Sequence, residues 1–213
     1  MPVNNLTVLG MECSGRIVSI ALSSHGSFWE ISMEAGSRHS EILMPMVAFL
    51  LESAGITPKE IHIAACAAGP GTFTGLRIGM AAVKGIVRGT NCIFKTVPTL
   101  PLLAAGREHW PGLVVPIMDA RKQRVYAAAF QNGKQIIDDC DIALDDFFRS
   151  LPSGQKILVT GPDAKRAEGR ENITIDPLFH SSRGRPLVEM AAALFETCGE
   201  DSREVGPTYL RLS

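Results

Sequence analysis

Residues 11–26 read MECSGRIVSIALSSHG, and residues 118–133, which follow at an offset of 107 positions, read MDARKQRVYAAAFQNG. Each segment opens with methionine and an acidic residue, Glu12 or Asp119, and each ends in glycine after a short run of β-forming residues. Such a run followed by His-Gly or Asn-Gly predicts a strand that enters a tight turn. Similar order at a fixed offset is the usual sign of a repeat. The sequence therefore predicts a duplicated unit of three strands joined by turns.

The apolar pattern around these segments predicts alternating strands and helices. The expected strands are residues 6–11, 16–23, 27–33, 61–67, 92–97, 113–119, 124–130, 134–137 and 156–160. The expected helices are residues 40–53, 76–88, a short one ending near 108, 144–150 and 187–198. This alternation predicts an α/β fold. We expect two lobes, residues 1–103 and 104–213, the second reduced because little chain is left for its helices.

Paired lobes of this kind have a known chemical use. Nucleotide phosphates bind between the two hairpin turns through backbone N–H groups, and the acidic residue at each strand end can hold a divalent metal. Glu12 and Asp119 occupy those strand ends. An ATPase or a small-molecule kinase is therefore one interpretation of the chain.

Composition narrows the classes of protein. The 213 residues are 46% hydrophobic and 20% charged, with a formal net charge of -1, which is typical of a globular protein. A protein that binds nucleic acid by itself usually has a strongly basic surface. Only a local cluster, Arg121, Lys122 and Arg124, points to such contacts, and a solvated hairpin turn explains the cluster equally well.

The cysteines and the apolar runs indicate the cellular compartment in which the protein works. The five cysteines are widely spaced and include no CxxC pair, which argues against a disulfide framework and a zinc–cysteine site. No charged leader precedes an apolar run at the start, and the longest apolar run, residues 42–51, is too short to span a bilayer. We expect a cytoplasmic protein with no membrane partner.

A glycine-rich loop, GPGTFTGLRIG at residues 69–79, joins an expected strand to the start of a helix. Glycines allow tight turns and close backbone approach there, and a helix N-terminus favours anions. The loop lacks the GK[ST] of a Walker loop, and the nearest lysine, Lys84, comes too late. A structural crossover and an anion-binding loop are both open interpretations.

This loop resembles the signature of the TsaB (YeaZ) family. Further segments resemble that family in order and spacing: HSE at 39–41, MDAR at 118–121 ahead of Val125-Tyr126, and PTYLR at 207–211. Together the segments span nearly the whole chain. The turn at residues 11–14, MECS, departs from the family's small, hydroxyl-rich turn, which weakens the inference of nucleotide binding there.

The resemblance implies a duplicated actin-like ATPase (ribonuclease H-like) fold. It also implies a non-catalytic scaffold that helps to make threonylcarbamoyladenosine beside the anticodon of tRNA. The implied partners are a TsaD-like catalytic paralogue, a TsaE-like ATPase and a second copy of this chain, with tRNA contacted only through the complex. The resemblance implies that this chain requires no cofactor, and ATP or ADP at the interface with partners is an open alternative. The candidate nucleotide-binding residues are Ser14, Gly71, Thr72 and Asp119.

The residue pattern offers little for catalysis. The metal site of the catalytic paralogue needs two histidines one helical turn apart, and no two of the five histidines are three or four residues apart. Cys66 lies in an apolar strand, where cysteine is usually core. Ser14 has no base near it in the sequence. We therefore expect no catalytic residue and no metal ligand.

The two expected helices of the first lobe carry the partner prediction. The helix near residues 42–51 is apolar nearly all round, so it needs cover on more than one side. The second helix mixes large apolar residues with glycine and alanine, which allow close approach of another helix. The predicted interface residues are Leu43, Met46, Val47, Leu50, Leu76, Gly79, Met80 and Val83. A plain homodimeric interaction module, and burial of these residues in an ordinary core, are the alternatives.

Overall fold

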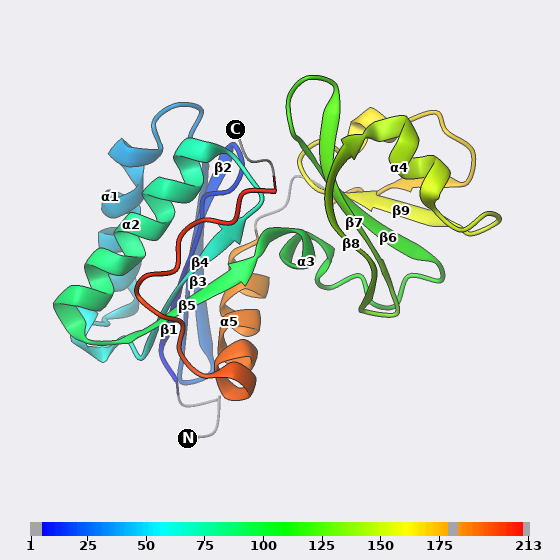
Figure 1. Ribbon diagram of the computed structural model, residues 1–213. Helices are drawn as coiled ribbons and strands as arrows, with labels where there is room; N and C mark the ends of the chain where they lie inside the picture. Colours follow the sequence, from blue (N-terminus) through cyan, green and yellow to red (C-terminus); the bar gives the residue numbers. More distant parts are fainter. Residues whose placement is uncertain (1–5, 179–182, 211–213) are drawn as a thin grey trace. The chain divides into compact units, whose positions relative to one another are not determined.

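The computed structural model describes residues 6–178 and 183–210 (Figure 1). The described chain forms two compact units. The first unit contains the residues up to Thr99 together with 183–208, and the second contains 100–178 with the two described residues that follow Thr208. Arg211, the last residue of the C-terminal PTYLR segment, lies outside the described residues.

The first unit is built on a five-stranded sheet in the order β3-β2-β1-β4-β5. Its strands are β1 (Val8–Glu12), β2 (Ile17–Ser24), β3 (Ser27–Glu34), β4 (Ile63–Gly69) and β5 (Ile93–Pro98). Its helices are α1 (His39–Ala54), the 3₁₀ turn η2 (Pro58–Glu60), α2 (Phe73–Thr90) and α5 (Gly184–Cys198). β1 pairs antiparallel with β2 and parallel with β4. Both faces of the sheet are covered, because α1 and α2 lie side by side on one face and α5 lies on the other (Figure 1).

The second unit repeats this topology with fewer helices. Its sheet has the order β10-β9-β6-β7-β8. The strands are β6 (Leu113–Asp119), β7 (Arg124–Gln131), β8 (Lys134–Ala143), β9 (Ile157–Thr160) and β10 (Ile173–Ile175). The helical elements are α3 (Thr99–Ala104), α4 (Leu144–Ser150) and the 3₁₀ turn η3 (Ala164–Ala167). β6 pairs antiparallel with β7 and parallel with β9, as β1 pairs with β2 and β4.

The predicted duplication is confirmed in topology, with a one-residue shift in pairing register: Glu12 lies opposite Ser19, whereas Asp119 lies opposite Val125. Glu12 and Asp119 end the first strand of their units. The following hairpins turn at His25-Gly26, with φ of 48° and 79°, and at Asn132-Gly133, with φ of 50° and 74°. Two successive positive φ angles match the right-handed twist of the flanking strands, so both copies use the same tight turn. The predicted α/β, duplicated actin-like fold with a reduced second lobe is therefore confirmed.

Helix α5 differs from its expected place. Its residues were expected in the second lobe, yet the helix packs on β1 and β2 of the first sheet. The contact is close at Gly10, where an added Cβ would lie 2.8 Å from Val188 Cγ1 and 3.0 Å from Leu187 Cδ2. Glycine in the middle of β1 thus makes room for the helix. Sequence order alone did not indicate this packing.

Candidate functional site

The turn between β1 and β2 is where this fold can bind phosphate, and here it is tied to its own chain. The Ser14 backbone N–H donates to Glu12 Oε1 at 2.7 Å. The Ser14 carbonyl accepts the backbone N–H of Thr72 at 2.7 Å. The Gly15 carbonyl accepts a hydrogen bond from His39 Nε2 at 3.0 Å. One donor and two acceptors of the turn are therefore already used within the first unit.

The glycine-rich loop packs directly against this turn. An added Cβ at Gly71 would lie 2.7 Å from the Ser14 carbonyl oxygen. At Gly75 it would lie 2.0 Å from the Cys13 carbonyl oxygen, and at Gly79 3.1 Å from Cys13 Cβ. Because real Cβ atoms do not approach backbone oxygens below about 3 Å, the first two positions exclude any larger residue. The glycines serve close packing of loop and helix onto the turn.

Burial controls the charge of Glu12 at this turn. Burial raises the pKa of the Glu12 carboxyl, while hydrogen bonds from Ser14 and the nearby charges of Arg183 and His39 lower it in part. Glu12 is 6% exposed, and one oxygen of its carboxyl accepts the Ser14 backbone N–H. A carboxyl that is desolvated and used to fix a turn is poorly placed to hold a divalent metal.

The pKa of Glu12 predicts how stability depends on pH. The stability that Glu12 contributes is fully present below its ordinary pKa of 4.5 and is lost as the pH rises through its raised folded-state pKa. Glu12→Gln keeps an oxygen for Ser14 and stays neutral. We expect the variant to melt at a higher temperature than the wild type at neutral pH, with a difference that shrinks in acid. Melting curves across the pH range test this, and a variant that is less stable at neutral pH contradicts it.

The thiols near the turn are unsuited to nucleophilic chemistry. Burial raises the pKa of the Cys66 thiol to about 12. Burial also raises the pKa of Cys13, and the Glu12 carboxylate raises it further. Because only the thiolate is a good nucleophile, both groups are inert near neutral pH. The expectation that Cys66 is core is confirmed, since its exposure is 1%.

The corresponding turn of the second unit is exposed to solvent and carries two basic residues, Arg121 and Lys122. Asp119 is exposed, and its Oδ1 accepts hydrogen bonds from Arg166 Nη1 at 3.0 Å and from the Arg121 backbone N–H at 3.1 Å. Its own backbone N–H donates to Asp163 Oδ2 at 2.7 Å. The partner of the Asp119 carboxylate is thus Arg166 of η3, which the sequence did not indicate.

The candidate nucleotide-binding residues fall into two groups. Ser14, Gly71 and Thr72 meet at the closed turn of the first unit. Asp119 belongs to the second unit. No cluster of three or more histidine, cysteine, aspartate or glutamate side chains suited to a metal ion occurs in residues 6–178 and 183–210.

The predicted partner-surface residues lie in the core of the first unit. All eight are buried against the sheet: Leu43, Met46, Val47, Leu50, Leu76, Gly79, Met80 and Val83. Met46 and Met80 in particular are core residues, at most 4% exposed. The large apolar side chains that α1 and α2 present to solvent are Met44, Phe49 and Phe73, at 45%, 59% and 55% exposure. We call these three residues the outer helix face.

A C-terminal strap, residues 199–208, is bound along the first unit. Asp201 accepts hydrogen bonds at 2.7 Å from Lys95 Nζ, from the Thr96 backbone N–H and from Thr96 Oγ1. Further along, Lys84 Nζ donates to the Val205 carbonyl at 2.6 Å, and the Thr208 N–H donates to the Ala68 carbonyl at 2.7 Å. The strap thereby brings part of the PTYLR segment to the glycine-rich loop. Sequence reasoning missed the Lys95–Asp201 pair because the two residues are 106 positions apart.

The length and apolar character of the helices show whether any of them could span a membrane. Within the described ranges, none of the helices combines the length and the apolar character that a bilayer span requires.

Comparisons with known proteins place the chain in a family. Residues 32–175 match the family model described as "TsaD: tRNA N6-adenosine threonylcarbamoyltransferase". The "tRNA threonylcarbamoyladenosine biosynthesis protein TsaB" of Bacillus subtilis is 31% identical over 164 residues, which cover 74% of this chain and 72% of the relative. The Escherichia coli protein of the same name is 30% identical over 128 residues, covering 59% of this chain and 55% of that relative.

A solved structure agrees with these relatives. "YeaZ from Pseudomonas aeruginosa" superposes with a TM-score of 0.80 at 23% identity, covering 96% of this chain and 100% of that one. At this identity the likeness shows a shared fold, in line with the repeated topology described above. The sequence matches add the family itself. The chain belongs to the TsaB (YeaZ) family, and it matches the TsaD family model over residues 32–175.

Proposed function

We propose that this chain is a non-catalytic scaffold subunit for threonylcarbamoyladenosine synthesis on tRNA, which acts by pairing with a TsaD-like catalytic paralogue. The pathway is that named for the TsaB relatives. The observation that carries the non-catalytic role is the closed turn of the first unit. The Glu12 carboxyl and the Ser14 carbonyl already have partners there, and the glycine-rich loop occupies the space beside them.

The outer helix face supports the pairing role. Met44 and Phe49 on α1 and Phe73 on α2 are exposed on two helices that contact each other. Large apolar side chains that stay exposed on adjacent helices are candidates for an interaction site. The proposed partner of this face is a helix pair of a TsaD-like paralogue, a family whose model matches residues 32–175 of this chain. In the absence of the paralogue a second copy of this chain is its occupant, and a TsaE-like ATPase joins the paired complex.

Reconstitution tests the proposal. The chain, a TsaD-like enzyme, a TsaE-like ATPase and the enzyme that supplies the threonylcarbamoyl group are combined with unmodified tRNA. We expect modification only when the chain and the TsaD-like enzyme are both present, and no ATP turnover by the chain alone. Magnesium-dependent ATP hydrolysis by the purified chain that is lost in Asp119→Ala would instead support the ATPase or kinase interpretation. Self-association without any effect of the chain on tRNA modification would support a plain interaction module.

Two neighbouring residues of α1 test the surface directly. Phe49 is 59% exposed and Leu50 is 3% exposed. We expect Phe49→Glu to stay folded, with a free energy of unfolding within about 0.5 kcal/mol of the wild type, and to lose at least about tenfold in affinity for the paralogue, because burial of a large apolar side chain contributes about 1.5–3 kcal/mol. Leu50→Glu should unfold, because it places a charge in the core.

Circular dichroism and size-exclusion chromatography with light scattering provide the measurements, with and without the paralogue. A folded Phe49→Glu variant that pairs as tightly as the wild type removes the outer helix face from the proposal.

A further inference from the structure

The tip of the β6–β7 hairpin holds its residues in an unusual backbone conformation. Arg121, Lys122 and Gln123 have φ of 63°, 51° and 62°, and all three are exposed. The left-handed region costs a residue with a β-carbon about 1 kcal/mol. Strain of this kind persists when the surrounding structure imposes it, and it concentrates at functional segments. Three such residues in succession, none of them glycine, call for a functional reason.

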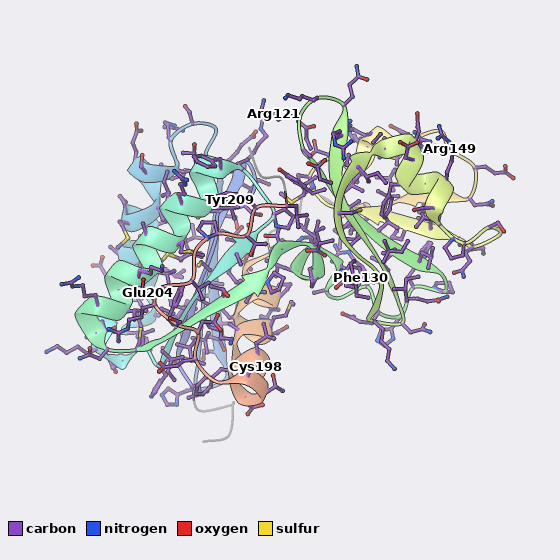
Figure 2. The ribbon with its side chains drawn as sticks, in the orientation of Figure 1. Arg121, Phe130, Arg149, Cys198, Glu204 and Tyr209 are labelled. Carbon is purple, nitrogen blue, oxygen red and sulfur yellow. The ribbon has the colours of Figure 1, made fainter. Side chains whose placement is uncertain are left out.

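Backbone bonds hold this hairpin tip in place. The Arg124 N–H donates to the Arg121 carbonyl at 3.0 Å, and the Ala120 N–H donates to the Arg124 carbonyl at 3.1 Å. The Arg121 N–H donates to Asp119 Oδ1. The tip is thus fixed through its main chain, and Figure 2 shows Arg121 at the tip of the hairpin. The side chains of Arg121 and Lys122 have no ion pair or hydrogen bond within residues 6–178 and 183–210.

Two acidic side chains near the tip, Asp119 and Asp141, are paired with other arginines. Arg166 binds the Asp119 carboxylate at 3.0 Å, and Arg124 binds Asp141 at 2.6 Å. Arg121 and Lys122 are exposed and form no ion pair of their own within the described part of the chain. The formal net charge of the chain is -1, so attraction of an anion by this protein would be local to such a tip rather than general.

We infer that the tip of the β6–β7 hairpin binds backbone phosphates of RNA, the tRNA substrate of the complex. The inference rests on the proposed function, which supplies an RNA partner. Arginine donates paired hydrogen bonds to phosphate oxygens, and lysine adds a mobile point charge. A rigid main chain that projects two adjacent cations reduces the ordering cost of each contact. RNA is favoured over an acidic protein because phosphate contacts need only charge and no apolar surface, and Arg121 to Gln123 offer none.

The test removes both charges and measures binding as a function of salt. The chain and its TsaD-like partner are titrated with fluorescent unmodified tRNA. We expect the double variant Arg121→Gln with Lys122→Gln to bind about tenfold more weakly at about 0.1 M salt. The slope of log affinity against log salt should fall by about 1–2, since each lost phosphate contact lowers it by about 0.7–0.9.

Two controls distinguish the effect of charge at the hairpin tip from the effect of charge elsewhere on the unit and from the effect of backbone strain. Lys134→Gln with Lys156→Gln removes the same charge from the opposite end of the same sheet, where β8 and β9 begin, and should leave affinity and slope unchanged. Gln123→Gly relieves one strained residue and keeps both cations, so it should raise the melting temperature and preserve binding.

The outcomes decide between RNA and other occupants. Unchanged affinity and slope in the tip variant overturn the inference. Loss of the protein complex in that variant, seen by size exclusion, overturns it as well, because the tip would then contact a protein. If the wild-type chain forms no complex at all, the proposed function fails. The same titration at low salt on the isolated chain then decides the role of the tip.

Discussion

Gly75→Ala is expected to lower the free energy of unfolding by about 3 kcal/mol, the upper range for forcing extra atoms into a packed interior. The new Cβ would lie 2.0 Å from the Cys13 carbonyl oxygen and 2.6 Å from Thr72 Oγ1. Backbone atoms must move to relieve such overlap, which separates α2 from the turn after β1. For a chain of this size, the melting temperature should fall by about 10 °C.

Gly85→Ala is the matched control on the same helix. An added Cβ there meets nothing within 4 Å, and alanine favours a helix over glycine by about 1 kcal/mol. We expect this variant to be more stable than the wild type. The two melting temperatures should therefore move in opposite directions, and equal melting of Gly75→Ala and wild type would refute the close packing of loop and turn.

Asp201→Ala is expected to have the second large effect, a loss of about 3 kcal/mol. The side chain of Lys95 is 4% exposed and donates to Asp201 at 2.7 Å. Removal of the carboxylate leaves this buried ammonium with the Gly199 carbonyl as its remaining acceptor among the described residues. It also frees the strap from the Thr96 backbone. Denaturant unfolding measures the loss. Hydrogen exchange should show that the amide of Thr208 becomes less protected.

The effect of Asp201→Ala should depend on pH. Burial opposes ionisation of Asp201, but hydrogen bonds from Lys95 and Thr96 outweigh it and lower the pKa of the carboxyl below its ordinary 3.8. The stability that Asp201 contributes is therefore present above that ordinary pKa and is lost as the pH falls through the lowered pKa. The difference between variant and wild type should shrink in acid.

An exposed pair supplies the control for Asp201. The side chains of Glu34 and Arg16 are 66% and 78% exposed and lie 3.2 Å apart. Exposed ion pairs contribute little, so Glu34→Ala should change the free energy of unfolding by less than about 0.5 kcal/mol. A comparable loss in both variants would mean that burial of Lys95 is unimportant.

Local sequence determined the repeated strands and their turns. The tight turns at His25-Gly26 and Asn132-Gly133 follow from residues that tolerate positive φ, and the acidic strand ends follow from position within the repeat. The strand at Ile63–Gly69 was predictable because a continuous apolar run suits a strand covered on both faces. The end of β8 was less clear, since the polar residues after Ile137 hide a strand that continues to Ala143.

The direction in which each helix faces was decided by the tertiary structure. Helix α1 is apolar nearly all round, so the spacing of its apolar residues does not predict which side packs on the sheet. The fold buried Met46 and exposed Met44. The residues of α5 likewise do not indicate which of the two sheets the helix covers. The helix can pack on β1 because Gly10 has no side chain at the contact.

The polar contacts of the site could not be predicted from the sequence either. Glu12 at a strand end suggests a metal ligand, and only the approach of Ser14 and the glycine-rich loop shows that its carboxyl fixes a turn. Lys95 and Asp201 look like surface residues until the strap brings them together. Sequence by itself determined the local elements and the family signature, because these depend on neighbouring residues. Burial and pairing depend on residues far apart in the chain, and only the tertiary structure brings those into contact.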